Sequence, residues 1–163
     1  MRGEYFSYGL LAALAIALLY AAITDIRHRR IDNWLNAAIA LTAPLFWWAT
    51  DLPLWPGLAW QLGSALICFA LCCLLVALRQ MGGGDLKLLT ALALWIEPIW
   101  FLRLFVVMAL IGGVLTLFFA ARHFARRQKD KPAIPYGIAI ACAGLWTLAN
   151  QYLPAIKAGG QLG

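Results

Sequence analysis

Residues 101–121, FLRLFVVMALIGGVLTLFFAA, decide the class of this protein. A single arginine interrupts a run that otherwise holds no charged side chain. A helix of ~20 apolar residues is long enough to cross the ~30 Å hydrocarbon core of a bilayer. The same character extends through the chain of 163 residues, of which 64% are hydrophobic and 12% charged, with a mean hydropathy of +0.80. We therefore expect a polytopic membrane protein and not a soluble domain.

Six apolar segments are predicted to be transmembrane helices. They cover residues 5–24, 34–48, 57–78, 86–96, 101–121 and 134–153. None shows the alternation of a barrel strand, so the sequence predicts an all-α fold. The first segment is interpreted as a retained helix, because its apolar core is longer than the ~7–15 residues of a typical secretory signal. Residues 1–163 are expected to form one transmembrane domain.

Basic residues are distributed unevenly between the predicted connections. The connections at 25–33, 79–87 and 122–133 hold ten of the thirteen, namely Arg27, Arg29, Arg30, Arg79, Lys87, Arg122, Arg126, Arg127, Lys129 and Lys131. The positive-inside rule therefore predicts that these connections face the cytoplasm, with both termini outside a cytoplasmic (inner) membrane. This topology accounts for the net charge of +6, so the bilayer is the expected partner and nucleic acid is not.

Tryptophans lie towards the opposite, outer ends of the segments. They are Trp47, Trp48, Trp55, Trp60, Trp95 and Trp100. Such a distribution predicts an interfacial aromatic belt. The four cysteines, in contrast, all lie within apolar segments, whereas a structural zinc site needs paired cysteines in polar loops. Cys68 and Cys72 share a helix face and are expected to pack in the interior, and neither a metal nor a cofactor is predicted.

Three of the seven acidic residues, Asp25, Asp32 and Asp85, lie at predicted cytoplasmic ends of helices. Only eleven residues, nine of them apolar, separate Asp85 from Glu97. At ~1.5 Å per residue they cover about half of the hydrocarbon thickness. If Glu97 marks the outer boundary, Asp85 lies below the cytoplasmic surface, where polar backbone needs protein or a watery cavity around it. An ionisable residue in such a place predicts a functional site.

Two aspartates in one cavity can hydrolyse an amide. Carboxyls held close together share a proton, so one activates water while the other polarises the carbonyl. We predict Asp25 and Asp85 as this pair. Helix dipoles favour Asp85 as base and Asp25 as acid, although such a pair titrates as a unit. Asp32 directly precedes the second helix and is predicted to cap its backbone N–H groups.

Three glycines, Gly82, Gly83 and Gly84, precede Asp85. Because glycine has no Cβ, they permit positive φ and the close approach of another backbone, such as that of an extended peptide. The alternative interpretation is a flexible loop that happens to contain glycine.

Three stretches of the chain resemble motifs of the type IV prepilin peptidases, which are membrane aspartic proteases of the G-x-G-D type. TDIRHRRIDN, residues 24–33, resembles the family's first aspartate motif, and GGGDLKLL, residues 82–89, resembles the second, G-x-G-D-x-K. IPYGIAIACAG, residues 134–144, resembles the Pro-Tyr-Gly start of the last helix. The layout is similar to that of the short form associated with tight-adherence (Flp) pili.

The resemblance implies an activity and a set of site residues. Asp25 and Asp85 take the two catalytic places of an aspartic-type endopeptidase that removes the leader of prepilin-like precursors at the cytoplasmic face. The residues implied to shape the site are Gly82, Gly83, Gly84, Lys87, Pro135, Tyr136 and Gly137. Pilus assembly or secretion machinery is a possible partner. No stretch corresponds to the N-methyltransferase region of longer members, so cleavage without methylation is expected. Asp32 stands where the first motif usually has proline.

Two other functions remain open at this point. A small proton-coupled transporter could use Asp25 and Asp85 as proton relays, although a relay needs polar groups spread through the membrane and these acids lie near one face. An inactive subunit of a pilus secretion complex would keep the topology without needing both aspartates.

Overall fold

The computed structural model describes residues 2–125 and 136–159. Within these ranges it contains α1 (Arg2–His28), α2 (Asn33–Ala49), a short turn η1 (Leu54–Leu58), α3 (Ala59–Ala77), α4 (Gly83–Ala93), α5 (Pro98–Ala125) and α6 (Tyr136–Gly159). The described part of the chain holds no strand, so the all-helical prediction is confirmed. The first two residues of the predicted segment 134–153 lie outside the described ranges.

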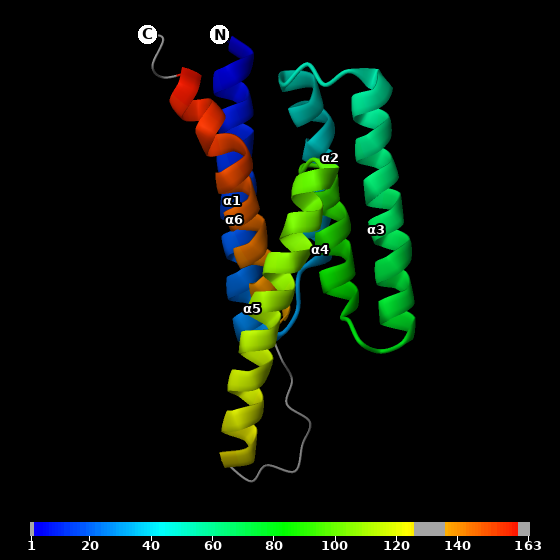
Figure 1. Ribbon diagram of the computed structural model, residues 1–163, viewed down its shortest axis with the longest axis vertical. Helices are drawn as coiled ribbons and strands as arrows, with labels where there is room; N and C mark the ends of the chain where they lie inside the picture. Colours follow the sequence, from blue (N-terminus) through cyan, green and yellow to red (C-terminus); the bar gives the residue numbers. More distant parts are fainter. Residues whose placement is uncertain (1, 126–135, 160–163) are drawn as a thin grey trace.

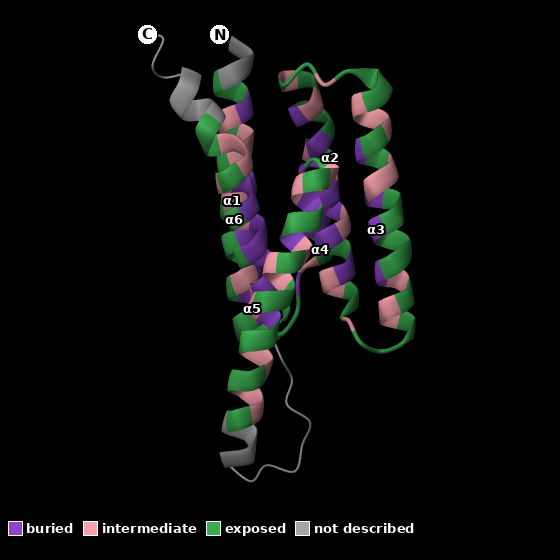
Figure 2. Cartoon of the chain, in the orientation of Figure 1, coloured by how far each residue is buried: buried purple, intermediate pink, exposed green. Residues whose placement is uncertain are grey.

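Three of these helical segments are long and apolar enough to cross a membrane: Tyr5–His28, Leu54–Ala77 and Pro98–Ala121. Exposed residues run along the outside of the helices (Figure 2). Many of them are large and apolar, and Leu41, Leu66 and Leu110, for example, are 76%, 69% and 67% exposed. An apolar surface of this extent is what lipid covers in a membrane protein. The expected number of six spans and the side of the termini stay predictions.

The bundle is built around the short helix α4. Figure 1 shows α1 and α6 side by side with α5 packed on α6, while α3 stands on the other side of α4. α4 contacts α2, α3 and α6, and its Leu88, Leu89 and Leu92 are completely buried. Each such leucine contributes about 1.5–3 kcal/mol on burial, so this helix carries much of the core although it is only 11 residues long.

The C-terminal end of α4 lies inside the bundle. Figure 1 shows the turn between α4 and α5 part-way along the molecule, set back from the connection between α2 and α3. Gln61 Nε2 donates hydrogen bonds to the carbonyls of Ala93 and Ile96 at 3.0 and 2.8 Å, and Trp47 and Tyr152 donate to the two carbonyls between them at 2.7 and 3.0 Å. Helix-end carbonyls at membrane depth need such partners. The C-terminal end of α4 is thus enclosed by the bundle, and the depth of Asp85 in a membrane stays a prediction.

Trp95 does not belong to the predicted aromatic belt, and that assignment is wrong. Its side chain is 2% exposed, its Nε1 donates to the carbonyl of Ile39 at 2.8 Å, and its ring stacks on Phe46 with centroids 4.9 Å apart. Trp48 and Trp55, in contrast, are 75% and 80% exposed. A tryptophan that can satisfy its N–H inside the core is as stable there as at an interface.

Candidate active site

Asp25 lies in the last turns of α1 and is buried, with 6% of its surface exposed. The helix continues to His28, and Arg29 then adopts a left-handed φ of 53° while its N–H donates to the carbonyl of Asp25 at 2.9 Å. This ending turns the chain back towards α2. The Asp25 carboxyl is thereby directed into the bundle, while the arginine side chains of this connection stay exposed.

The start of α6 is packed against the Asp25 carboxyl. A Cβ on Gly137 would lie 2.6 Å from Oδ2 and 2.8 Å from Cγ of Asp25, so only glycine fits there. The backbone N–H groups of Gly137 and Ile138 face this carboxyl, although Oδ2 makes no hydrogen bond within the described residues. The carboxyl therefore lies between the C-terminal end of one helix and the N-terminal end of another. Their dipoles oppose each other, so the predicted acid and base roles do not follow from the dipole of α1 alone.

Asp85 is held by the first turn of α4. Gly82 occupies the N-cap position with extended backbone, and its N–H hydrogen-bonds the Asp85 carboxyl, as the third helical residue does in a capping box. A Cβ on Gly82 would lie 3.0 Å from Oδ2 of Asp85. Burial, and then the negative charge of Asp25, raise the pKa of Asp85 to about 6. Asp85 lies outside the three helices long enough to span a membrane.

One pocket of about 380 Å³ brings the two aspartates together. It lies between the connection from α1 to α2 and the first turn of α4. Its walls are formed by Asp25, Arg29, Arg30, Ile31, Asp32, Asn33, Gly82, Gly83, Gly84 and Asp85. Two carboxyls that are sixty positions apart in the sequence thus share one polar cavity, and each influences the protonation of the other.

A family model of type IV leader peptidases matches residues 12–119. The chain belongs to the type IV leader peptidase family. The matched region includes Asp25 and Asp85 and ends before α6. Membership makes the chain a protease of the prepilin leader peptidase kind. No match was found among curated proteins or among solved structures.

Two of the three glycines of this leader peptidase, Gly82 and Gly84, permit close packing, and none of the three has an unusual backbone angle. None of the described glycines has a positive φ, so that part of the prediction is wrong. A Cβ on Gly84 would lie 3.3 Å from Cβ and 3.5 Å from the backbone nitrogen of Ile31, which lets the connection between α1 and α2 pack against α4. A Cβ on Gly83 would meet nothing within 4 Å, so the space beside it stays open towards the pocket.

Lys87 and Tyr136, two further residues implied by the motifs, do not line this pocket. Lys87 donates from Nζ to Oδ1 of Asn33 at 2.7 Å and faces a neighbouring pocket. The ring of Tyr136 packs beside Gly112 of α5, where an added Cβ would lie 3.6 Å from Cε1. Pro135 lies outside the described residues.

Asp32 occupies the N-cap position of α2, as predicted, but its side chain makes no capping hydrogen bond. It lines the aspartate pocket instead. Three acids therefore border one cavity. Within the described ranges, however, no three His, Cys, Asp or Glu side chains are placed to hold a metal ion together.

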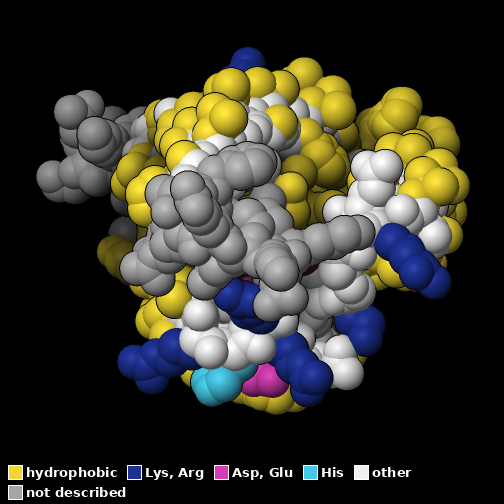
Figure 3. Space-filling model, turned by 90° about the horizontal axis from the view of Figure 1, so that it is seen from below, with side chains coloured by type: hydrophobic (Ala, Val, Ile, Leu, Met, Phe, Trp, Pro, Cys, Tyr) yellow, Lys and Arg dark blue, Asp and Glu magenta, His cyan; other side chains and the backbone are white. Residues whose placement is uncertain are grey.

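The end of the molecule that carries the pocket is basic. Figure 3 shows lysine and arginine side chains around this end, with hydrophobic side chains covering the flanks. Arg27, Arg29, Arg30, Arg79 and Lys87 are all exposed here. The aspartate pocket is thus an acidic cavity within a basic surface.

Two residues beside the site, Ile31 and Asn36, were not predicted from the sequence. Ile31 is buried at 7% exposure against Gly84, and a lone apolar residue within RHRRIDN was the available indication. Asn36 is buried at 5% exposure one turn after Asn33. A carboxamide in an otherwise apolar helix segment could have drawn attention to it.

Proposed function

We propose that this chain is a membrane aspartic endopeptidase that removes the leader peptide of type IV or Flp prepilin-like precursors at the cytoplasmic face of the inner membrane. Asp25 and Asp85 carry the reaction. The observation that supports this assignment is the single pocket lined by both carboxyls. The proposal includes six spans with both termini outside, and cleavage without methylation of the product.

The chemistry follows from a shared proton. The ionised member of the pair removes a proton from water, which attacks the scissile carbonyl, while the protonated member donates a hydrogen bond to the carbonyl oxygen. The tetrahedral intermediate then collapses as a proton is delivered to the leaving amine. The pKa of Asp85 is raised to about 6 by burial and by the charge of Asp25, which is the direction expected for one of two carboxyls that share a proton.

The substrate must reach the carboxyls as an extended strand. A helix shields its own carbonyls through internal hydrogen bonds, so the segment ahead of the precursor's membrane helix has to unwind. The open space beside Gly83 is the side from which such a backbone can approach Asp85. The precursor's own helix stays in the bilayer beside the bundle.

Charge is expected to influence binding in two directions. Arg29 and Arg30 line the pocket and repel a basic leader, whereas Asp25, Asp32 and Asp85 attract it. The three acids are more buried than the two exposed arginines. Charges interact more strongly where water is excluded, so we expect the attraction of the leader to outweigh the repulsion. The exposed arginines serve membrane orientation under this proposal.

Co-expression with a prepilin-like precursor tests the function. Asp25→Asn and Asp85→Asn should each reduce leader removal by at least about 10²-fold, the lower end of what general acid–base catalysis contributes. Asp51→Asn is the matched control, because Asp51 is exposed, remote from the pocket, and has a φ of 50° that asparagine also tolerates.

Two outcomes would contradict the proposal. If either Asp25→Asn or Asp85→Asn processed the precursor normally, the two aspartates would not be the catalytic pair. A wild-type protein that processes no precursor but moves protons across vesicle membranes would instead favour the transporter.

A further inference from the structure

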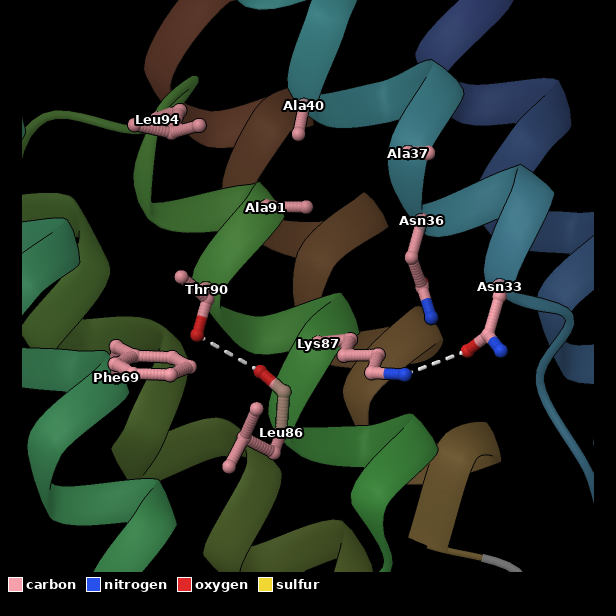
Figure 4. A pocket seen from close by; sticks show the side chains of 10 residues that line it. All are labelled: Asn33, Asn36, Ala37, Ala40, Phe69, Leu86, Lys87, Thr90, Ala91 and Leu94. Carbon is pink, nitrogen blue, oxygen red and sulfur yellow. Dashed lines mark hydrogen bonds between the residues drawn. The ribbon is translucent and has the colours of Figure 1, made fainter.

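A second pocket lies next to the aspartate pocket, between α2, α3 and α4. Its volume of about 350 Å³ is at the lower end of the ~300–1,000 Å³ typical of ligand sites. Figure 4 shows its wall, in which Ala37, Ala40, Phe69 and Leu94 provide apolar surface. Phe69 is 44% exposed, so the pocket opens towards the side of the bundle that lipid would cover.

Asn36 is the polar group in this wall that has no partner. Its side chain is 5% exposed, and neither Oδ1 nor Nδ2 makes a hydrogen bond in the described structure. Lys87, in contrast, donates to Asn33 at 2.7 Å, and the Thr90 hydroxyl donates to the carbonyl of Leu86 at 2.9 Å (Figure 4). Buried amides are nearly always hydrogen-bonded, so an unpaired one is costly and calls for a ligand.

The chemistry of Asn36 selects the kind of ligand. A carboxamide presents one acceptor and one donor group side by side, which matches the N–H and C=O of a peptide backbone. Lipid chains offer neither group. A transmembrane helix has already paired its backbone internally. An unwound peptide segment with apolar side chains is the occupant that satisfies both Asn36 and the apolar wall.

The two pockets adjoin each other. Asn33 lines both of them, and Leu86 and Lys87 of the second pocket directly follow Asp85 of the first. In Figure 4 the second pocket extends from Asn33 and Lys87 along α2 and α4 to Ala40 and Leu94. It therefore runs from the aspartates into the bundle, in the direction that a chain takes when it passes from a cytoplasmic leader into the bilayer.

Resting on the proposed function, we propose that Asn36 binds the main chain of the precursor just after the cleaved bond. The carboxamide pairs with one peptide group of the unwound segment. An apolar side chain of that segment lies against Ala40, Phe69 and Leu94. Asn36 is thus a positioning residue, which fixes the register of the strand so that the scissile bond reaches Asp25 and Asp85.

The test uses the full-length protein in detergent and synthetic precursors with one backbone amide at a time replaced by an ester. An ester lacks the N–H and weakens the carbonyl as an acceptor. With the wild-type protein, the ester at one position after the cut should lower kcat/KM by about tenfold, as expected for the loss of a hydrogen bond in a buried site. The Asn36→Leu variant should have about tenfold lower kcat/KM than the wild type on the all-amide precursor. The same ester should not lower the kcat/KM of this variant any further.

The matched control is Asn150→Leu, because Asn150 is exposed on α6 and bonds only within its own helix. It should leave both kcat/KM and the ester profile unchanged. Thermal unfolding of Asn36→Leu should show a protein at least as stable as wild type, since the substitution removes an unpaired buried amide.

The outcomes separate this inference from the proposed function. A kcat/KM of Asn36→Leu within threefold of the wild-type value (~0.65 kcal/mol) would overturn the role of Asn36. The same conclusion would follow if the ester lowered kcat/KM of Asn36→Leu as much as that of the wild type at every position. Neither result would affect the proposed function. A wild-type protein that cleaves no precursor would overturn the proposed function and this inference with it.

Discussion

Gly137→Ala is expected to inactivate the protein without unfolding it. The added Cβ would lie 2.6 Å from Oδ2, 2.8 Å from Cγ and 3.0 Å from Cβ of Asp25. Before Oδ2 reaches the 3.4 Å at which ordinary contacts begin, the carboxyl must move by about 0.8 Å. A displacement of ~1 Å of a catalytic group costs about 10²-fold in rate. The buried Asp25 side chain has little room to avoid the methyl group, because three of its atoms would be in contact with that group at once.

The stability cost of this substitution should be small. Overpacking costs about 1–3 kcal/mol, while replacing a helical glycine with alanine returns about 1 kcal/mol. The assay therefore measures leader removal and thermal unfolding in parallel. Gly113→Ala is the control, since a Cβ at that helical position meets nothing within 4 Å, and it should be as active as wild type. If Gly137→Ala cleaves within threefold of wild type, the position of the Asp25 carboxyl against α6 is irrelevant to catalysis.

Four further predictions concern the site and its support. Because burial and the charge of Asp25 raise the pKa of Asp85 from 3.8 to about 6, its ionised form is unfavourable in the folded protein. Lowering the pH from 8 to 5 should therefore stabilise the fold by about 1.4 kcal/mol through this group, and Asp85→Asn should reduce the pH dependence of thermal unfolding by that amount. Gln61→Leu should lower stability by about 2–4 kcal/mol, because two buried carbonyls of the α4–α5 turn lose their donor, and an unchanged melting temperature would contradict this. Gly84→Ala should lower the stability of the fold, because the added methyl group would press against Ile31 in the connection between α1 and α2. Gly83→Ala should leave stability unchanged and should reduce kcat/KM if a peptide passes beside Gly83. Asp32→Asn should retain processing, since the Asp32 side chain makes no capping bond and asparagine is an equally good N-cap residue. If the Asp32→Asn variant did not cleave the precursor, Asp32 and not Asp25 would be the partner of Asp85.

The helices could be predicted from sequence because lipid exposure imposes long apolar runs. Their ends could not. α1 was expected to end near Thr24, yet it continues to His28, because exposed polar and basic residues at a helix C-terminus remain helical and interact favourably with its dipole. α4 was expected to reach 96 and ends at Ala93. Its last carbonyls bond to side chains of other helices, and such partners are invisible in a local pattern.

The candidate site was predictable to the extent that it depends on local chemistry. Asp25 and Asp85 stand out because few acids occur in so apolar a chain. The contact of Gly137 with Asp25 joins positions more than one hundred residues apart, and only the resemblance to the Pro-Tyr-Gly motif indicated that Gly137 lies beside the site. Asn36 is a similar case. Its lack of a partner is a property of the packed bundle and not of the sequence around it.

α6 connects the supports of the two aspartates. At its start, Gly137 lies against Asp25, and near its other end the Tyr152 hydroxyl donates to the carbonyl of Trp95 at the end of α4. Asp85 sits at the opposite end of α4, which is a rigid helix with a completely buried face. The separation of the two carboxyls therefore depends on how α6 packs between α1 and α4. Gly144, whose added Cβ would lie 3.1 Å from Leu18 and 3.4 Å from Leu92, allows that packing to be close. The relative position of the two carboxyls is therefore determined as much by the last helix as by the two motifs that carry the acids.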